Sequence, residues 1–246
     1  MSAVPSVHQQ RDFTAKGYHI VDAFLPKERC AELLAQIAEF RQHHQIAEIS
    51  RPARERPLRY SVIDGDQIRA YLPEIQALYV EVNKVVNEAT GENLVPLQDS
   101  KVACNINITK PNGTYRWHYD RNALTVILYL NTVEGGETDC YPNYRFFLPK
   151  LRFSRLQHWI DDVMQHPLIR RIIGRLVVVK PTAGTLFMMR GNRSLHSVRP
   201  VTSDFERINV IMSYDTPGAN YAVTNQLNAY IYNQSAVQSG DPNYQK

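Results

Sequence analysis

Apolar residues in the first part of the chain follow one strand pattern and then two helix patterns. Residues 17–24 (GYHIVDAF) have the aromatic and β-branched character of a short strand. Apolar residues then recur at helical spacing over residues 26–44 and again over residues 73–91. A proline lies at the start of each of these two segments, and Gly91 lies at the end of the second, as expected at helix termini. This region therefore predicts a strand followed by two long helices.

Two polar stretches lie beside these elements. The first dozen residues are polar and carry one proline, which predicts a loose terminus. Residues 48–59 are rich in arginine and carry two prolines, which predicts a loop. Neither stretch is predicted to form a helix or a strand.

After residue 93 the pattern changes to short strands separated by turn sequences. Residues 102–109 alternate between apolar and polar side chains, and residues 124–130 form an apolar run of strand length. Residues 155–175 have a helical pattern with a break near Pro167. Further short strands are predicted at residues 176–179, 185–189, 197–201 and 208–214.

Helices followed by many short strands favour an antiparallel sandwich or barrel with a helical buttress. Neither a GxGxxG nor a GxxxxGK(S/T) sequence is present, so a Rossmann or P-loop enzyme is disfavoured. We expect a single domain over residues 1–246. It comprises a strand and helical buttress over residues 1–93, a β core over residues 94–217 with an insert at about 140–175, and a C-terminal extension over residues 218–246.

Composition is that of an ordinary globular protein. The hydrophobic fraction is 43% and the charged fraction 21%, and 246 residues suffice to bury a sizeable core. No apolar run is long enough to span a membrane, and the N-terminus shows no secretory signal pattern. The three cysteines lack CxxC spacing, which predicts reduced thiols and a cytoplasmic location.

Positive charge is concentrated in one stretch. The whole chain has a formal net charge of +4, whereas residues 145–180 carry eight basic residues against two acids. Such a stretch can attract anionic ligands, or it can be a solvated helical surface. The insert that contains most of it is longer than a hairpin loop, and we interpret it as a lid over a small molecule or as a packed surface excursion.

Three residues predict a metal site. His118 and Asp120 are two residues apart, so on an extended segment both side chains would point to one face. Among the remaining histidines His196 stands out, because it follows a predicted strand and a glycine-containing turn. Two histidines and one carboxylate suit non-haem Fe(II), whereas zinc more often takes a tetrahedral set of ligands. An isolated His-x-Asp pair is also common as a structural hydrogen-bonded pair.

Two further residues could serve the same site. Arg207 starts a predicted strand, and a guanidinium that enters a barrel requires an anion, for which a carboxylate is a fitting partner. The alternative is a structural ion pair with Glu206 or Asp204. Tyr129 lies on the strand that follows the His-x-Asp motif, and it could either hydrogen-bond the same carboxylate or be a core aromatic.

Together these residues resemble the Fe(II)/2-oxoglutarate-dependent oxygenases, in the prolyl-hydroxylase-like branch. The resemblance runs from about residue 102 to residue 217, and it rests on the order and spacing of short motifs. These are His118-Tyr-Asp120, Leu128-Tyr-Leu-Asn131 with Gly135-Gly-Glu-Thr138, Gly184-Thr-Leu-Phe187, and Leu195-His-Ser-Val-Arg-Pro-Val201 with Arg207.

The resemblance implies a fold that is mainly β with α, a double-stranded β-helix (jelly roll) core buttressed by the N-terminal helices. It implies that His118, Asp120 and His196 hold Fe(II). It also implies that Arg207 and Tyr129 hold the distal carboxylate of 2-oxoglutarate. Asn107 is a further candidate for the cosubstrate site, or else a solvent-facing strand residue, and the same two interpretations apply to Asn209.

The resemblance also implies a reaction. 2-Oxoglutarate chelates the iron, O2 is the oxidant, and succinate and CO2 are released as an unactivated C–H bond is hydroxylated. Ascorbate is a candidate activator. Halogenases of this kind carry a small residue at the carboxylate position so that halide can bind. Because Asp120 is present, hydroxylation is the expected outcome.

The substrate class is the least determined feature. Nucleic-acid demethylases of this kind carry a second arginine six residues after the first; here that residue is Ser213, so no nucleic-acid partner is expected. No membrane partner is expected either, and a homodimer is the assembly that base rates favour. We expect a small molecule, an amino acid or a derivative of one, with Arg116 and Arg121 as candidate substrate contacts. Alternatives are a protein or peptide (prolyl-type) hydroxylase and a desaturase or cyclase of a natural-product pathway.

Overall fold

Seven helices lie within the part of the chain that the structure, a computed structural model, describes, namely residues 7–53, 55–146, 148 and 155–219. Four of them come before the β core, one short helix leads into its first strand, and two lie within the insert. The helices are α1 (Val7–Lys16), α2 (Lys27–His43), α3 (Gly65–Tyr71), α4 (Pro73–Thr90), α5 (Ser100–Ala103), α6 (Arg155–Met164) and α7 (Pro167–Ile173).

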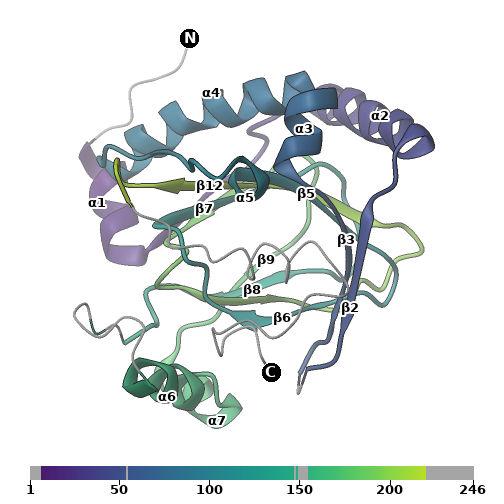
Figure 1. The fold of residues 1–246 in the computed structure, drawn as a ribbon. Coiled ribbons are helices and arrows are strands. Elements are labelled where there is room, and N and C mark those ends of the chain that lie inside the picture. Colours follow the sequence, from purple (N-terminus) through teal and green to yellow (C-terminus); the bar gives the residue numbers. More distant parts are fainter. Residues whose placement is uncertain (1–6, 54, 147, 149–154, 220–246) are drawn as a thin grey trace.

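The strands form two antiparallel sheets that face each other (Figure 1). The large sheet has the order β1-β10-β7-β12-β5-β3-β2, with β4 beside β12, and the small sheet has the order β6-β11-β8-β9. The strands are β1 (Tyr18–Val21), β2 (Ala47–Arg51), β3 (Leu58–Ile63), β4 (Val95–Pro96), β5 (Cys104–Thr109), β6 (Tyr115–His118), β7 (Leu124–Tyr129), β8 (Thr138–Tyr141), β9 (Val177–Val179), β10 (Leu186–Met189), β11 (Leu195–Val198) and β12 (Arg207–Asp215).

Side-chain alternation gives the large sheet one apolar face and one mixed face. On β12, Val210 and Met212 belong to the main apolar core, which lies between this sheet and the layer of helices α1 to α4 (Figure 1). The alternate residues Arg207, Asn209 and Ser213 are buried on the opposite face, toward the small sheet. The space between the two sheets is therefore partly lined by polar groups, as a binding site requires.

The helical layer is held by a continuous apolar contact. Ile75, Val82 and Val86 of α4 are fully buried in the main core, and Phe13 of α1 packs into the same cluster. Burial of these side chains, rather than helix propensity alone, positions the buttress against the sheet. The predicted helix at residues 73–91 is confirmed, and Gly91 caps it with a left-handed φ of +69°.

Replacing Ile75 by alanine is expected to destabilise the protein by about 2–5 kcal/mol, because the substitution leaves a cavity in a closed core. Val80 on the same helix is 52% exposed, so Val80→Ala serves as the matched control and should change stability by less than about 0.5 kcal/mol. Urea unfolding followed by circular dichroism measures both values. Equal losses in the two variants would show that α4 is not anchored as described.

Two predictions for the N-terminal region are wrong. The loose terminus predicted for the first dozen residues is in part helix α1, because the buried Phe13 ties that segment to the core; residues 1–6 lie outside the described residues. Both ends of the loop predicted at residues 48–59 are strand, because they belong to β2 and β3, which pair antiparallel. Among the strands that the structure describes, β2 pairs only with β3 and so lies at the edge of the sheet, where charged side chains are tolerated.

The insert between β8 and β9 folds as two helices, as its pattern and the break near Pro167 predicted. It lies beside the small sheet, on the side away from the large sheet (Figure 1). Arg145 anchors it: the guanidinium binds Asp161 of α6 at 2.9 Å and lies 4.8 Å from the centre of the Tyr119 ring. The insert therefore packs directly on the segment between His118 and Asp120, and Arg145 is engaged in that contact.

Candidate metal centre

A β-bulge at the end of β6 sets the direction of the first histidine. His118 pairs with His196 of β11, whereas Tyr115 pairs with Val198, so two residues of β6 stand opposite one of β11. The bulge places Tyr115 and His118 on the same face, with ring centres 4.7 Å apart. Asp120 follows the strand rather than continuing it. The sequence argument assumed an uninterrupted extended segment; the convergence instead depends on this bulge and on the bend after it.

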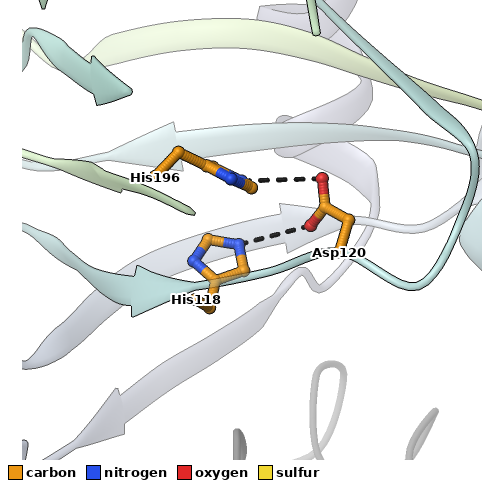
Figure 2. Close-up of side chains that lie close together, drawn as sticks. All are labelled: His118, Asp120 and His196. Carbon is orange, nitrogen blue, oxygen red and sulfur yellow. Dashed lines mark ion pairs between the residues drawn. The ribbon is translucent and has the colours of Figure 1, made fainter. Parts of the chain in front are cut away.

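Three side chains meet at the mouth of the sandwich (Figure 2). The Nε2 atom of His118 lies 3.4 Å from Oδ1 of Asp120, and the Nε2 atom of His196 lies 3.5 Å from Oδ2 of the same carboxylate. One ligand atom from each residue lies within 4.8 Å of the other two. These are the residues that the sequence predicted as metal ligands, and they come from β6, the following bend and β11.

Backbone carbonyls fix the orientation of both imidazoles. The Nδ1 atom of His118 is 2.9 Å from the carbonyl oxygen of Arg116, and the Nδ1 atom of His196 is 3.0 Å from that of Ser194. A carbonyl can only accept, so each Nδ1 carries the proton and each Nε2 presents a lone pair. Metal-binding histidines in proteins are commonly oriented in this way, by an acceptor that binds the other ring nitrogen.

Ionisation also favours metal binding. Burial lowers the pKa of His196 to about 4, with a further decrease from the neighbouring His118, so this imidazole is neutral at physiological pH. Burial acts to raise the pKa of Asp120, but the two imidazoles and a hydrogen bond from Thr125 outweigh it and lower that pKa to about 2. At neutral pH His196 therefore presents a neutral nitrogen donor and Asp120 presents a carboxylate.

The carboxylate is held by a second set of contacts that the sequence analysis did not identify. The Thr125 hydroxyl donates to Oδ2 of Asp120 at 2.5 Å, and the Asn122 amide donates to the Thr125 oxygen at 2.9 Å. Behind them, the backbone N–H of Asp120 binds the carbonyl of Gly191 at 3.1 Å. A Cβ on Gly191 would lie 2.6 Å from the Thr125 oxygen, so only glycine allows this approach.

Thr125→Val is expected to weaken Fe(II) binding by about tenfold, because the Asp120 carboxylate loses the hydrogen bond that orients it and becomes free to rotate. Thr125→Ser keeps the hydroxyl and should bind Fe(II) nearly as well as the wild-type protein. Equilibrium dialysis of the metal-free protein under anaerobic conditions gives both constants. Equal affinity in the wild-type protein and the valine variant would show that Thr125 does not position Asp120.

Arg207 is buried deeper in the same interior. Its guanidinium donates to Oδ1 of Asn209 and, at 3.1 Å, to the hydroxyl of Thr138. It lies 5.1 Å from the centre of the Tyr129 ring. Burial lowers the pKa of Arg207, which reflects the cost of keeping this charge away from water.

The acids near Arg207 in the sequence do not neutralise it. Glu206 binds Arg41 of α2 at 2.6 Å instead, so the alternative of a structural pair with Glu206 is wrong. Within the described ranges, no carboxylate lies within ion-pair distance of Arg207. Two buried donors, Nε of Arg207 and Nδ2 of Asn209, also lack an acceptor there. A buried guanidinium group with one unpaired N–H, beside an unpaired amide N–H of Asn209, fits a carboxylate ligand.

The other candidate cosubstrate residues line the same wall. Asn209 is paired in register with Asn107 on one side and with Tyr129 on the other, so the three side chains form a row across β5, β12 and β7. Asn107 is buried, so its solvent-facing alternative is wrong. Burial raises the pKa of Tyr129, which keeps the phenol protonated, and it donates to the Thr138 hydroxyl at 2.7 Å.

The remaining predicted residues lie close to the centre. Arg116 is buried in the bulge, where its carbonyl orients His118, and Arg121 is half-buried in the bend after Asp120. The role of either side chain as a substrate contact remains a prediction. Thr138 was missed as an individual residue, although it ends the Gly135-Gly-Glu-Thr138 motif.

Several solved structures share this fold. Solved structures with the same architecture include SnoK, a non-haem α-ketoglutarate-dependent carbocyclase of nogalamycin biosynthesis, with a TM-score of 0.67, 18% identity and coverage of 88% of each chain. The epimerase SnoN of the same pathway has a TM-score of 0.65 and 16% identity over 85% of this chain and 80% of its own. A prolyl hydroxylase from Trichoplax adhaerens has a TM-score of 0.58 and 19% identity over 83% and 86%. The expected fold, the jelly roll of the Fe(II)/2-oxoglutarate oxygenases, is confirmed.

A narrower assignment comes from the sequence itself. A family model described as Halogenase D matches residues 2–232. The chain therefore belongs to the Halogenase D family. A comparison with curated proteins finds no match.

Proposed function

We propose that this protein is an Fe(II)- and 2-oxoglutarate-dependent dioxygenase that hydroxylates an unactivated C–H bond of a small molecule. One observation carries the proposal. The interior holds a group of two histidines and one carboxylate at one end and a buried arginine without a carboxylate partner, among the described residues, at the other. The first suits Fe(II), and the second suits the distal carboxylate of 2-oxoglutarate. A solved complex of SnoN contains Fe3+ and α-ketoglutarate, which supports the same cofactors here.

The two ends of the interior differ in how far they are exposed to solvent. Arg207 is 2% exposed and Tyr129 is fully buried, whereas the side chain of Asp120 is 18% exposed. A dicarboxylate held at Arg207 would therefore lie in the deep part, and the accessible side of the metal would remain for the substrate. Asn107, at 8% exposure, lies between these extremes and could contact either molecule.

The intact carboxylate favours hydroxylation over halogenation. Two histidines and a carboxylate leave three positions open on an octahedral metal. The cosubstrate and O2 would draw on these open positions. A halide would therefore require the position that Asp120 fills. Thr125, Asn122 and Gly191 hold that carboxylate in place, which makes its displacement costly.

The interior surface supports a small polar substrate. Asn105 and Ser213 are buried on the same face as the metal group, beyond the row that contains Asn107. Amide and hydroxyl groups in such a position suit an amino acid or a derivative of one. Among the described residues, no helix is long and apolar enough to cross a membrane. The three cysteines are free and buried, which supports a reducing, cytoplasmic setting.

The residues of this chain have separable tasks in the reaction. His118, His196 and Asp120 would hold Fe(II), which with 2-oxoglutarate supplies the oxidative decarboxylation that drives C–H hydroxylation. Arg207 would bind and orient the cosubstrate through charge-assisted hydrogen bonds. Apolar side chains between the sheets, including Phe187 and Met189, keep bulk water from the reacting groups.

A panel of free amino acids tests the proposal. The protein is incubated with Fe(II), 2-oxoglutarate, O2 and ascorbate, with and without chloride, and the products are identified by mass spectrometry. We expect the gain of one oxygen atom with stoichiometric succinate, whether or not chloride is present. Gain of chlorine would contradict the hydroxylase assignment, loss of two hydrogens would favour the desaturase or cyclase alternative, and turnover of proline-containing peptides alone would favour the peptide hydroxylase.

A further inference from the structure

A second pocket, separate from the metal centre, lies on the outer face of the small sheet. It has a volume of about 430 Å³ and is bounded by α7, by the connection between β2 and β3, and by outward-facing residues of β6 and β8. This volume lies within the range of small-molecule sites. Trp117 and Asp139 point into it, whereas their neighbours His118 and Cys140 belong to the interior of the sandwich. The proposed function gives this pocket no task.

The pocket carries an excess of positive charge. Four guanidinium groups and two carboxylates line it, which leaves a net charge of +2. The residues come from distant parts of the sequence, so the cluster is a product of the fold. The arginines are Arg56, Arg170, Arg171 and Arg199, and the acids are Glu55 and Asp139.

Among the residues that line the pocket, two carboxylates pair with three of the four guanidinium groups. The carboxylate of Asp139, which is 2% exposed, accepts through Oδ2 from Arg56 at 2.7 Å and from Nε of Arg199 at 3.0 Å, so one carboxylate serves two guanidinium groups. Glu55 pairs with Arg170 at 2.6 Å. Where the structure describes the chain, no carboxylate lies within ion-pair distance of the exposed Arg171.

Two of the arginines, Arg56 and Arg170, are held in place before any ligand binds. The guanidinium carbons of Arg170 and Arg56 lie 4.2 Å and 4.9 Å from the centre of the Trp117 ring, and the indole N–H donates to Glu55 at 3.1 Å. Arg56 also has a left-handed φ of +51°, a conformation that non-glycine residues adopt infrequently. Side chains fixed in this way lose little entropy on binding and present planar donor forks.

We propose that this pocket binds a dianion of the phosphate class. The net charge of +2 among the lining residues matches a doubly charged oxyanion, and arginine guanidinium groups can bind its oxygens bidentately. Such a ligand would join α7 to the small sheet through Arg171 and Arg199. It would thereby fix the insert against the strands that carry His118 and His196 on their other face. The site is independent of the proposed oxygenase reaction.

Calorimetric titration of the full chain with inorganic phosphate at pH 8, in a chloride buffer of constant ionic strength, tests the proposal. We expect saturable binding at one site and a rise in the thermal midpoint. The double variant Arg171→Gln/Arg199→Gln should weaken this binding by about tenfold or more, since each charge-assisted hydrogen bond contributes substantially. Arg69→Gln is the matched control, because Arg69 is exposed on α3 and should not alter the affinity.

Phosphate could instead occupy the interior beside Arg207, so the titration is repeated with Arg207→Gln. Unchanged phosphate binding in this variant would support the separate site even if the protein proves not to bind 2-oxoglutarate. Loss of binding in Arg207→Gln but not in the double variant would overturn the proposal, as would the absence of saturable binding to the wild-type protein.

Discussion

Asp120→Ala is expected to reduce Fe(II) affinity by more than about 100-fold and to abolish substrate-dependent succinate formation. The reason is that even the partners of metal ligands change affinity by about 10–100-fold, and this substitution removes a ligand itself. His118→Ala and His196→Ala should behave in the same way. The Nε2 atoms of both imidazoles lie within 3.5 Å of the Asp120 carboxylate, so each variant removes one ligand from the same set of three.

A control separates loss of metal from loss of fold. His43 is exposed at the end of α2, so His43→Ala removes a histidine without touching the interior. This control should keep wild-type Fe(II) binding, and all the variants should keep the wild-type circular dichroism spectrum. Normal turnover by Asp120→Ala would exclude it as an essential ligand, and gain of a halogenated product would show that the open position accepts halide.

Arg207→Gln is expected to raise the 2-oxoglutarate concentration needed for half-maximal binding by about 100-fold, because two charge-assisted hydrogen bonds at 1.5–3 kcal/mol each would be lost or weakened. Fe(II) affinity should change little, since Arg207 has no contact with the metal group. The buried position of the guanidinium adds a second effect. Without an anion its charge is uncompensated among the described residues, so 2-oxoglutarate should also stabilise the wild-type protein against heat.

Thermal unfolding with and without 2-oxoglutarate measures this stabilisation. The control is Arg69→Gln, an exposed arginine of α3 that pairs with Asp66. The control should show the wild-type increase, whereas Arg207→Gln should show none. An equal increase in both variants would mean that another residue holds the distal carboxylate.

The candidate site was largely predictable because its chemistry is concentrated in short motifs. His118 and Asp120 are close in the sequence, His196 follows a strand whose pattern is clear, and Arg207 starts another. The contacts that orient these groups were not predictable. The bulge that turns His118 inward depends on the register between β6 and β11, and Thr125 looks like any polar residue in an apolar strand.

The fold also divides into elements that the sequence predicts and elements that it does not. Long amphipathic segments such as α2 and α4 appeared with nearly correct bounds, because burial on one face imposes the helical period. Helix α1 could not be predicted, since its stability comes from Phe13 packing on distant residues. Helix α3 carried a signal that the sequence analysis did not use. Asp64 and Gln67 form a capping box at its start.

The proposed phosphate pocket could not be predicted from the sequence. Its charged residues come from the β2–β3 connection, from β8, from α7 and from the chain after β11. The sequence showed an excess of basic residues over residues 145–180, but Arg145 within this stretch turned out to be neutralised by Asp161. Only the fold distinguishes such paired arginines from those that surround a pocket.

The most direct test of the account is an anaerobic titration of the metal-free protein with Fe(II) and 2-oxoglutarate, followed by visible absorption. We predict a weak metal-to-ligand charge-transfer band that saturates at one equivalent of each, is lost in Asp120→Ala, and requires far more 2-oxoglutarate in Arg207→Gln. Fe(II) binding without this band at saturating 2-oxoglutarate would contradict the account, because the interior would then hold a metal but not the cosubstrate on which the proposed reaction depends.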